Sequence, residues 1–179
     1  MREVYVQGIG VHKVGRFPEK TNFDLGRHAV LETMKDAGIG FKDIQVAYFS
    51  NRDDVTPSLG EQILGLIGLS GMPVVNLENA SCSGSTAFWL AYNAVALGQY
   101  DVALAFSAEQ SPRGFRPPPT GYRSSYAAMG MAVIPAAAAM LMRRRMRDYG
   151  ETVEQYALVA VKNRRHASLN PHAQYQQQI

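Results

Sequence analysis

Cysteine is almost absent from this sequence, and charged residues are few. One cysteine, Cys82, among 179 residues excludes an internal disulfide and a metal site built from several cysteines. Charged residues make up 18% of the chain and apolar residues 46%, so intrinsic disorder is not expected. No run of about eighteen apolar residues occurs, which excludes a transmembrane helix. The longest apolar stretch, residues 127–142, is interrupted by Gly130 and Pro135.

An excess of one charge sign is also missing. The chain has 18 basic and 15 acidic residues, a net charge of +3. Its one dense basic run consists of Arg143, Arg144, Arg145 and Arg147, and no nucleic-acid recognition motif accompanies it. The first residues do not combine a basic segment with an apolar one, so no secretory signal is expected. A lone thiol suits a reducing compartment. We therefore expect a soluble cytoplasmic protein with no nucleic-acid or membrane partner.

The spacing of apolar residues predicts four strands and three helices in the first 110 residues. The strands are expected at residues 3–7, 45–49, 73–77 and 101–106, and the helices at residues 21–37, 58–69 and 85–98. Thr21 and Asp24 form a capping pair, and Gly38 suits the end of the first helix. Gly8 and Gly10 are expected to turn the chain after the first strand. The β-α-β-α-β-α-β order predicts an α/β fold with a mostly parallel sheet.

The composition changes after residue 110. Residues 111–126 are rich in proline, arginine and serine, which is typical of an extended surface loop. Two helices are expected beyond it, from Pro135 to about Tyr149 and from Thr152 to about Ala167. We therefore divide the chain into a core, residues 1–110, and an extension, residues 111–179.

Cys82 is the residue for which chemistry is most expected. A predicted buried strand ends near Leu77, a polar turn follows, and an apolar helix begins near Ser85. Such a strand–turn–helix elbow presents nucleophiles in α/β enzymes, and the positive end of a helix stabilises a thiolate. The N–H of Cys82 is expected to stabilise an oxyanion, and the small residues Gly84 and Ser85 leave room for a substrate.

Two alternatives to a nucleophilic cysteine stay open. Cys82 would also fit the sequence as a buried thiol that packs like a small apolar side chain. Ser81, Ser83 and Ser85 are rival nucleophiles, although the sequence contains no G-x-S-x-G motif and no matching Asp/His arrangement.

Several segments of the chain resemble the N-terminal half of thiolases, particularly the sterol-carrier-protein type. VVNLENASCSGSTAF and GQYDVALAFSAEQ resemble the nucleophile region. YGETVEQYALVAVKNRRHASLNPHAQY resembles the loop region, and GIGVHKVGRF and LGRHAVLETMKDAGI resemble the start. The resemblance covers essentially the whole chain. It implies an αβαβα layered fold in which the helix after Cys82 is buried in a shared central layer.

The resemblance also implies an activity. Cys82 would take an acyl group from an acyl-CoA, in thiolysis of a 3-ketoacyl-CoA or in the reverse Claisen condensation, as part of lipid metabolism such as fatty acid β-oxidation. Coenzyme A would be a substrate, and neither a bound cofactor nor a metal is expected. Gly84 and Ser85 would lie beside the substrate, and Arg143 and Arg147 on one helix face would bind its phosphates. A solvated arginine face is the alternative.

The family's other catalytic motifs do not occur in the sequence. These are the base histidine of a Gly-His-Pro motif, a second cysteine in Cys-x-Gly, and an Asn-Glu motif. We therefore expect an inactive isolated chain, completed by a C-terminal half or a second subunit, within a homodimer or higher oligomer. Two other functions stay open: an aldolase-type relative that works with an OB-fold/zinc-ribbon partner, and a non-catalytic lipid-binding or scaffold module.

Overall fold

The computed structural model describes residues 1–54, 56–69, 71–110, 125, 129 and 134–179. The chain divides into two compact units, Met1–Ser111 and Pro112–Ile179. Apart from Ser125, the predicted loop of residues 111–126 lies outside the described residues, and so do its arginines, Arg113, Arg116 and Arg123.

The first unit is built on a parallel three-stranded sheet. Its strands are β1 (Val46–Ser50), β2 (Val74–Leu77) and β3 (Ala103–Ser107). They lie in the order β2-β1-β3, and Tyr48 of β1 stands opposite Val75 and Ala105. The predicted α/β fold with a parallel sheet is confirmed, because three of the four predicted strands form within a few residues of their expected positions.

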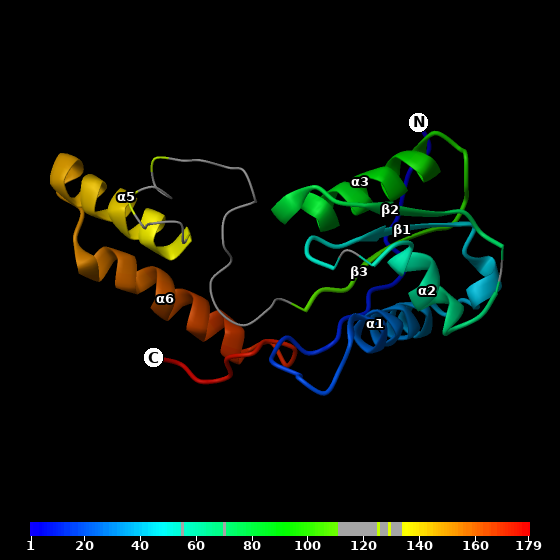
Figure 1. Ribbon diagram of the computed structural model, residues 1–179, viewed down its shortest axis with the longest axis horizontal. Coiled ribbons are helices and arrows are strands. Elements are labelled where there is room, and N and C mark those ends of the chain that lie inside the picture. The colour runs from blue at the N-terminus through cyan, green and yellow to red at the C-terminus, as the bar shows by residue number, and fades with distance from the viewer. Residues whose placement is uncertain (55, 70, 111–124, 126–128, 130–133) are drawn as a thin grey trace. The chain divides into compact units, whose positions relative to one another are not determined.

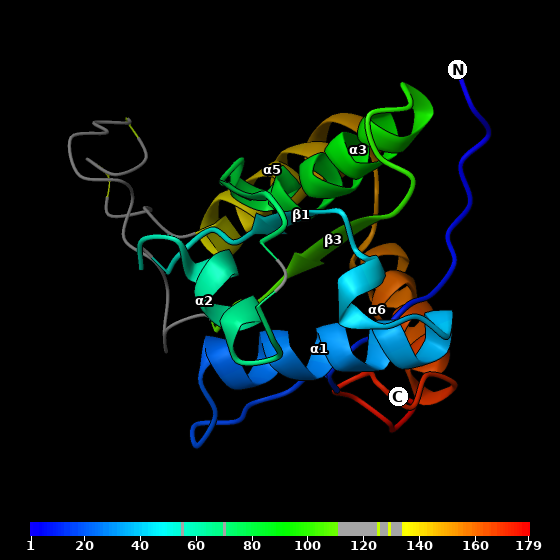
Figure 2. The ribbon, with the colours of Figure 1, turned by 90° about the vertical axis from the view of Figure 1, so that its right-hand side faces the viewer.

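Helices cover both faces of this sheet, as Figures 1 and 2 show. They are α1 (Asn22–Ala37), α2 (Leu59–Gly65) and α3 (Ser83–Ala96). Helices α1 and α2 lie against one face and α3 lies against the other. All five residues of β1 are buried as a result, which is typical of the central strand of a two-sided α/β sheet.

Each face of the sheet has its own apolar core. On the α1/α2 face, Phe49 and Phe106 place their ring centroids 5.0 Å apart. Gly60 of α2 lies so close to the sheet that an added Cβ would stand 2.5 Å from the Cβ of Phe49. On the α3 face, small residues such as Ala87 and Ala91 pack against the sheet.

Helix α1 begins and ends at the capping residues that the sequence predicts. The N–H of Asp24 donates to Thr21 Oγ1 over 3.3 Å, and the N–H of Thr21 donates to Asp24 Oδ2 over 2.8 Å. Gly38 ends the helix in the left-handed conformation, with φ +67°. Both predictions are confirmed, and the short 3-10 helix η1 (Phe41–Asp43) follows.

The N-terminal segment corrects a prediction, because residues 3–7 form no strand. The segment is held at its two ends: the N–H of Arg2 donates to the Ala96 carbonyl over 2.9 Å, and that of Ile9 to Asp36 Oδ2 over 2.8 Å. Between these points, its backbone forms no ladder with any part of the chain that the structure describes. Alternation of side chains indicates extended backbone, whereas a strand also needs a partner.

The expected turn at Gly8 and Gly10 is also wrong. Neither glycine has a positive φ, and both lie against α1. A Cβ on Gly10 would stand 2.3 Å from the backbone nitrogen of Thr33, and one on Gly8 would stand 2.6 Å from Ala37. These glycines therefore permit close packing on a helix instead of a change of chain direction.

Helices α2 and α3 differ from their predicted bounds. α2 ends at Gly65 because the chain then changes to tighter bonding, with the N–H of Leu66 donating to the Ile63 carbonyl. α3 starts at Ser83, two residues early, after the 3-10 helix η2 (Ala80–Cys82).

The burial expected for α3 is only partly observed. Its sheet side is covered, but Phe88, Trp89 and Tyr92 are 55%, 60% and 42% exposed. The helix is apolar nearly all round, and within the first unit only the sheet covers it. Within the described residues of the first unit, its outer face is therefore an apolar surface without a second layer.

The second unit contains α5 (Ile134–Tyr149) and α6 (Val153–Ser168). The predicted capping pair of Thr152 and Gln155 is confirmed, and Gly150 has a φ of +69° between the helices. Arg145 binds Glu151 through two nitrogens and, together with Tyr156, holds the pKa of that carboxyl below its usual range. Among the described residues, no helix combines the length and apolar character needed to cross a bilayer.

Candidate nucleophile site

Cys82 lies at an elbow between the sheet and α3. Strand β2 ends at Leu77, the chain passes through η2, and Cys82 is the N-cap residue of α3. Its thiol is exposed, which the buried-thiol alternative does not predict. The position is the one that the strand–turn–helix pattern indicated, at the carboxyl end of a parallel strand and the positive end of a helix.

The elbow contains a strained residue. Ala80 has φ +47°, in the left-handed region that side chains with a Cβ rarely adopt. Hydrogen bonds hold this conformation: the N–H of Ala80 donates to Glu78 Oε1 over 2.5 Å, and the N–H of Asn79 donates to Ser83 Oγ over 2.8 Å. Strain that the surroundings impose in this way is often found at functional sites.

The serines beside Cys82 have structural partners. Ser83 is 6% exposed, and its hydroxyl accepts from Asn79 and donates to the Ala80 carbonyl over 2.8 Å. The hydroxyl of Ser85 donates to the Cys82 carbonyl over 2.9 Å. Ser83 is therefore buried and its hydroxyl makes two hydrogen bonds, which argues against it as a nucleophile. These hydrogen bonds hold the elbow in place.

The backbone N–H of Cys82 already has a hydrogen-bond partner within the elbow. The N–H of Cys82 donates to the Asn79 carbonyl over 2.9 Å, as part of η2. Its role as an oxyanion donor stays a prediction, because this bond must open before the N–H can reach a substrate. No side chain caps the start of α3. A Cβ on Gly84 would meet no atom of the described chain within 4 Å, so this helix end is open.

The arginines proposed to bind phosphate lie in the second unit. Arg143 and Arg147 are exposed on α5. Their neighbours are engaged: Arg144 pairs with Asp148, and Arg145 pairs with Glu151. Cys82 lies in the first unit and Arg143 and Arg147 lie in the second, so the role of these arginines stays a prediction. The described residues contain no cluster of metal-ligating side chains.

Two features of the elbow were not predicted from the sequence. One is the left-handed backbone of Ala80, and the other is the role of Ser83 in holding the elbow through hydrogen bonds. Nothing in the type of residue marks Ala80, because left-handed backbone is usually signalled by glycine or asparagine. The clamp by Ser83 had a partial signal, since serine is favoured at helix starts for its backbone hydrogen bonds.

The fold and the elbow define an α/β protein that presents an exposed cysteine at the start of a helix packed on a parallel sheet. The chain belongs to the thiolase family: residues 7–179 match the family model described as "Thiolase, N-terminal domain". It is 35% identical to the benzoylsuccinyl-CoA thiolase subunit BbsB of Thauera aromatica, over 99% of this chain and 47% of that protein. It is 32% identical to an acetyl-CoA acetyltransferase of Methanothermobacter thermautotrophicus, over 100% and 49%.

Other relatives extend the same picture. Sterol carrier protein 2 of Gallus gallus is 26% identical over 98% of this chain and 35% of that protein. The chain thus spans half or less of the length of these relatives. Among solved structures, the Ltp2-ChsH2(DUF35) aldolase matches 97% of this chain and 46% of its own, with TM-score 0.76 and 25% identity. The Acat5 thiolase of Ascaris suum, in complex with coenzyme A, shares the fold with TM-score 0.62, 18% identity and coverage of 91% and 46%.

Proposed function

We propose that this chain is the N-terminal half of an enzyme that cleaves or forms a carbon–carbon bond in a CoA thioester, with Cys82 as its nucleophile. The observation that carries the proposal is the exposed thiol at a strained elbow, on the open N-terminus of α3. Two relatives at 35% and 32% identity are named as a thiolase subunit and an acetyl-CoA acetyltransferase, which supports acyl transfer.

In the thiolase direction, the Cys82 thiolate attacks the keto carbon of a 3-ketoacyl-CoA. The bond between carbons 2 and 3 breaks, and its electron pair passes to the departing acetyl-CoA, which takes up a proton. The acyl group is then bound to Cys82 as a thioester. Free coenzyme A attacks this thioester, takes the acyl group and regenerates the thiol. The acid and base of these steps are supplied from outside this chain.

An aldolase function has better support from the solved structures, because the Ltp2-ChsH2(DUF35) aldolase matches nearly the whole chain. A retro-aldol cleavage starts with loss of the proton from the β-hydroxyl group. The bond between carbons 2 and 3 then breaks to give a carbonyl product, and its electron pair passes to carbon 2 of the shortened acyl-CoA, which takes up a proton. No acyl-enzyme forms, so Cys82 is dispensable in this reaction. The two functions therefore make opposite predictions for the same residue.

We further propose that the site is completed by a partner: a C-terminal half or a separate subunit, within a homodimer or larger oligomer. The exposed apolar face of α3 supports a covering layer. BbsB is named as a subunit, and the aldolase is a complex of two named components. Gly84 and Ser85 would contact the thioester, and Arg143 and Arg147 the phosphates of coenzyme A.

The test uses the chain together with its complementing half or subunit. The complete enzyme and its Cys82→Ser variant are given a 3-ketoacyl-CoA with free coenzyme A, and separately a β-hydroxyacyl-CoA. Ser81→Ala serves as the matched control, since it alters a neighbouring exposed side chain. We expect Cys82→Ser to abolish thiolysis and Ser81→Ala to retain it. Undiminished cleavage of the hydroxyacyl-CoA by Cys82→Ser would establish the aldolase instead.

A non-catalytic module is the remaining alternative, and thiol reactivity discriminates it. We expect iodoacetamide to alkylate Cys82 in the folded chain at neutral pH, because the thiol is exposed. A thiol that resists alkylation, together with no turnover of either substrate, would favour a lipid-binding or scaffold role.

A further inference from the structure

Asn79 contacts the elbow with its backbone and with its side chain. Its N–H donates to Ser83 Oγ over 2.8 Å, and its carbonyl accepts from the N–H of Cys82 over 2.9 Å. Its side-chain Nδ2 donates to Thr86 Oγ1 over 3.0 Å. Three separate hydrogen bonds of one residue therefore join the turn before Cys82 to the start of α3, directly beside the strained Ala80.

Thr86 connects the side chain of Asn79 to the backbone of Cys82. The Thr86 hydroxyl donates to the Cys82 carbonyl over 2.9 Å, and the Ser85 hydroxyl donates to the same oxygen, also over 2.9 Å. A hydroxyl group has one proton to donate. Because Thr86 gives that proton to the Cys82 carbonyl, it accepts from Asn79, whose amide group supplies the N–H. We call these two bonds, from Asn79 through Thr86 to Cys82, the Asn79–Thr86 link.

The hydrogen bonds around Cys82 fix its thiol where packing does not. Cys82 is exposed, no side chain caps the start of α3, and a Cβ on Gly84 would meet no atom of the described chain within 4 Å. The peptide group before Cys82 is held by Asn79, and the one after it by Thr86 and Ser85. Since a residue has only two soft backbone dihedrals, holding both of its peptide groups also holds the direction in which its side chain leaves the backbone.

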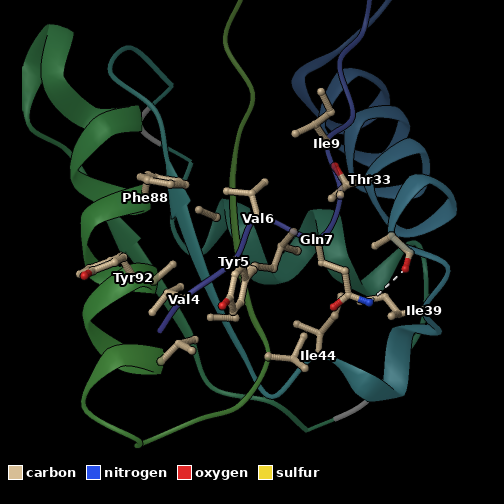
Figure 3. Close-up of a pocket in the computed structure, with 18 of the residues that line it drawn as sticks. Val4, Tyr5, Val6, Gln7, Ile9, Thr33, Ile39, Ile44, Phe88 and Tyr92 are labelled. Atoms are coloured by element: carbon tan, nitrogen blue, oxygen red, sulfur yellow. Dashed lines mark hydrogen bonds between the residues drawn. The ribbon is translucent and has the colours of Figure 1, made fainter. Parts of the chain in front are cut away.

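A comparison within the chain separates this arrangement from an ordinary helical threonine. Threonine in a helix often donates to the carbonyl four residues earlier, and Thr33 of α1 does so to Ala29 over 2.8 Å. Figure 3 shows Thr33 on α1, which packs on the face of the sheet opposite to α3. Thr86 makes the same kind of bond and also accepts from Asn79, so it ties its helix to the preceding turn.

We propose that Asn79 and Thr86 are positioning residues for the nucleophile. They touch no reacting atom and act through the backbone of Cys82, so this inference rests on the proposed function of that thiol. Without the link, the elbow relaxes and the thiol spends less time in the direction from which it attacks. A misdirected nucleophile slows the chemical step while substrate binding is kept, so kcat falls and KM does not change.

The test is a double-mutant cycle in the complete enzyme, with acyl transfer from a 3-ketoacyl-CoA as the assay. We expect Asn79→Ala and Thr86→Val each to lower kcat about tenfold, with KM changed less than about twofold. The double variant should also lose about tenfold and not about a hundredfold, because both changes break the same link. Thr86→Ser keeps the hydroxyl and should restore most of the kcat that Thr86→Val loses.

Thr33→Val is the matched control, because it makes the same substitution and removes the same kind of bond from α1. We expect it to leave kcat unchanged. A second readout does not depend on turnover: amide exchange at Cys82, whose N–H is bonded to the Asn79 carbonyl. Measured well below the Tm of each variant, this exchange should become about fivefold faster or more in Asn79→Ala and Thr86→Val.

Several results would overturn the proposal. Wild-type kcat in both single variants would do so, and so would a double variant whose loss equals the product of the single losses. An equal fall of kcat in Thr33→Val would mean that lost stability, and not the link, is responsible. If the wild type transfers no acyl group, the proposed function fails, and amide exchange at Cys82 then decides on the link: unchanged exchange in both variants overturns it, and faster exchange supports it.

Discussion

Replacing Ala80 by glycine tests whether the elbow beside Cys82 stores strain. Ala80 has φ +47°, and a left-handed conformation costs a residue with a Cβ roughly 1–2 kcal/mol. Glycine removes that cost but loses about 0.4–1 kcal/mol through its freer unfolded chain. The methyl group is exposed and contributes little packing. We therefore expect Ala80→Gly to stabilise the protein by about 0.8 kcal/mol, which corresponds to a rise in Tm of roughly 2–3 °C for a chain of this size.

The same change should weaken function, because a more flexible elbow holds the nucleophile less firmly. We expect kcat/KM of the complete enzyme to fall about tenfold or more, as misplacement of a reacting group does. Ala157→Gly, in the middle of α6, is the control: the same atoms are removed, but stability should fall by about 1 kcal/mol. A lower Tm of Ala80→Gly would contradict strain at this residue, and a higher Tm with unchanged kcat/KM would contradict a functional role for that strain.

Three further outcomes follow from close contacts and hydrogen bonds. Gly60→Ala should destabilise the protein by about 1–3 kcal/mol in urea unfolding, because its Cβ would overlap Phe49 at 2.5 Å; an unchanged midpoint contradicts this packing. Hydrogen bonds from Thr56 hold the pKa of Asp54 below its usual value, so its contribution to stability is present above about pH 4 and is lost as the pH falls further. Asp54→Asn should flatten this acid dependence of the unfolding free energy, and an unaltered slope counts against it. Ser83→Ala should cost about 1–2 kcal/mol and Ser83→Thr less, because the hydroxyl clamps the elbow; equal losses in the two variants would mean that the hydroxyl is not what matters.

The sequence patterns were sufficient for the local structure. The capping pair at Thr21 and the glycine at position 38 define the ends of α1, because each supplies a bond or a backbone conformation within a few residues. The parallel sheet also followed, since the predicted strands alternate with predicted helices along the chain. The location of Cys82 at the start of a helix followed from the same alternation.

The remaining features depend on contacts between distant parts of the chain. Residues 3–7 have the pattern of a strand, but pairing requires a neighbour that no local signal identifies. Gly10 suggested a turn, whereas its role is set by Thr33, more than twenty residues away. The strain at Ala80 arises from the bonds around it and not from its own type. The exposure of Phe88 likewise depends on which surfaces are present to cover α3.

The central claim is that Cys82 carries an acyl group during catalysis. The most direct measurement is to mix the complete enzyme with a 3-ketoacyl-CoA, quench the reaction, digest the protein and weigh its peptides. We expect the acyl mass on the peptide that contains Cys82, and no such mass in Cys82→Ser. Full turnover by Cys82→Ser, or an acyl group found only on another residue, would contradict it.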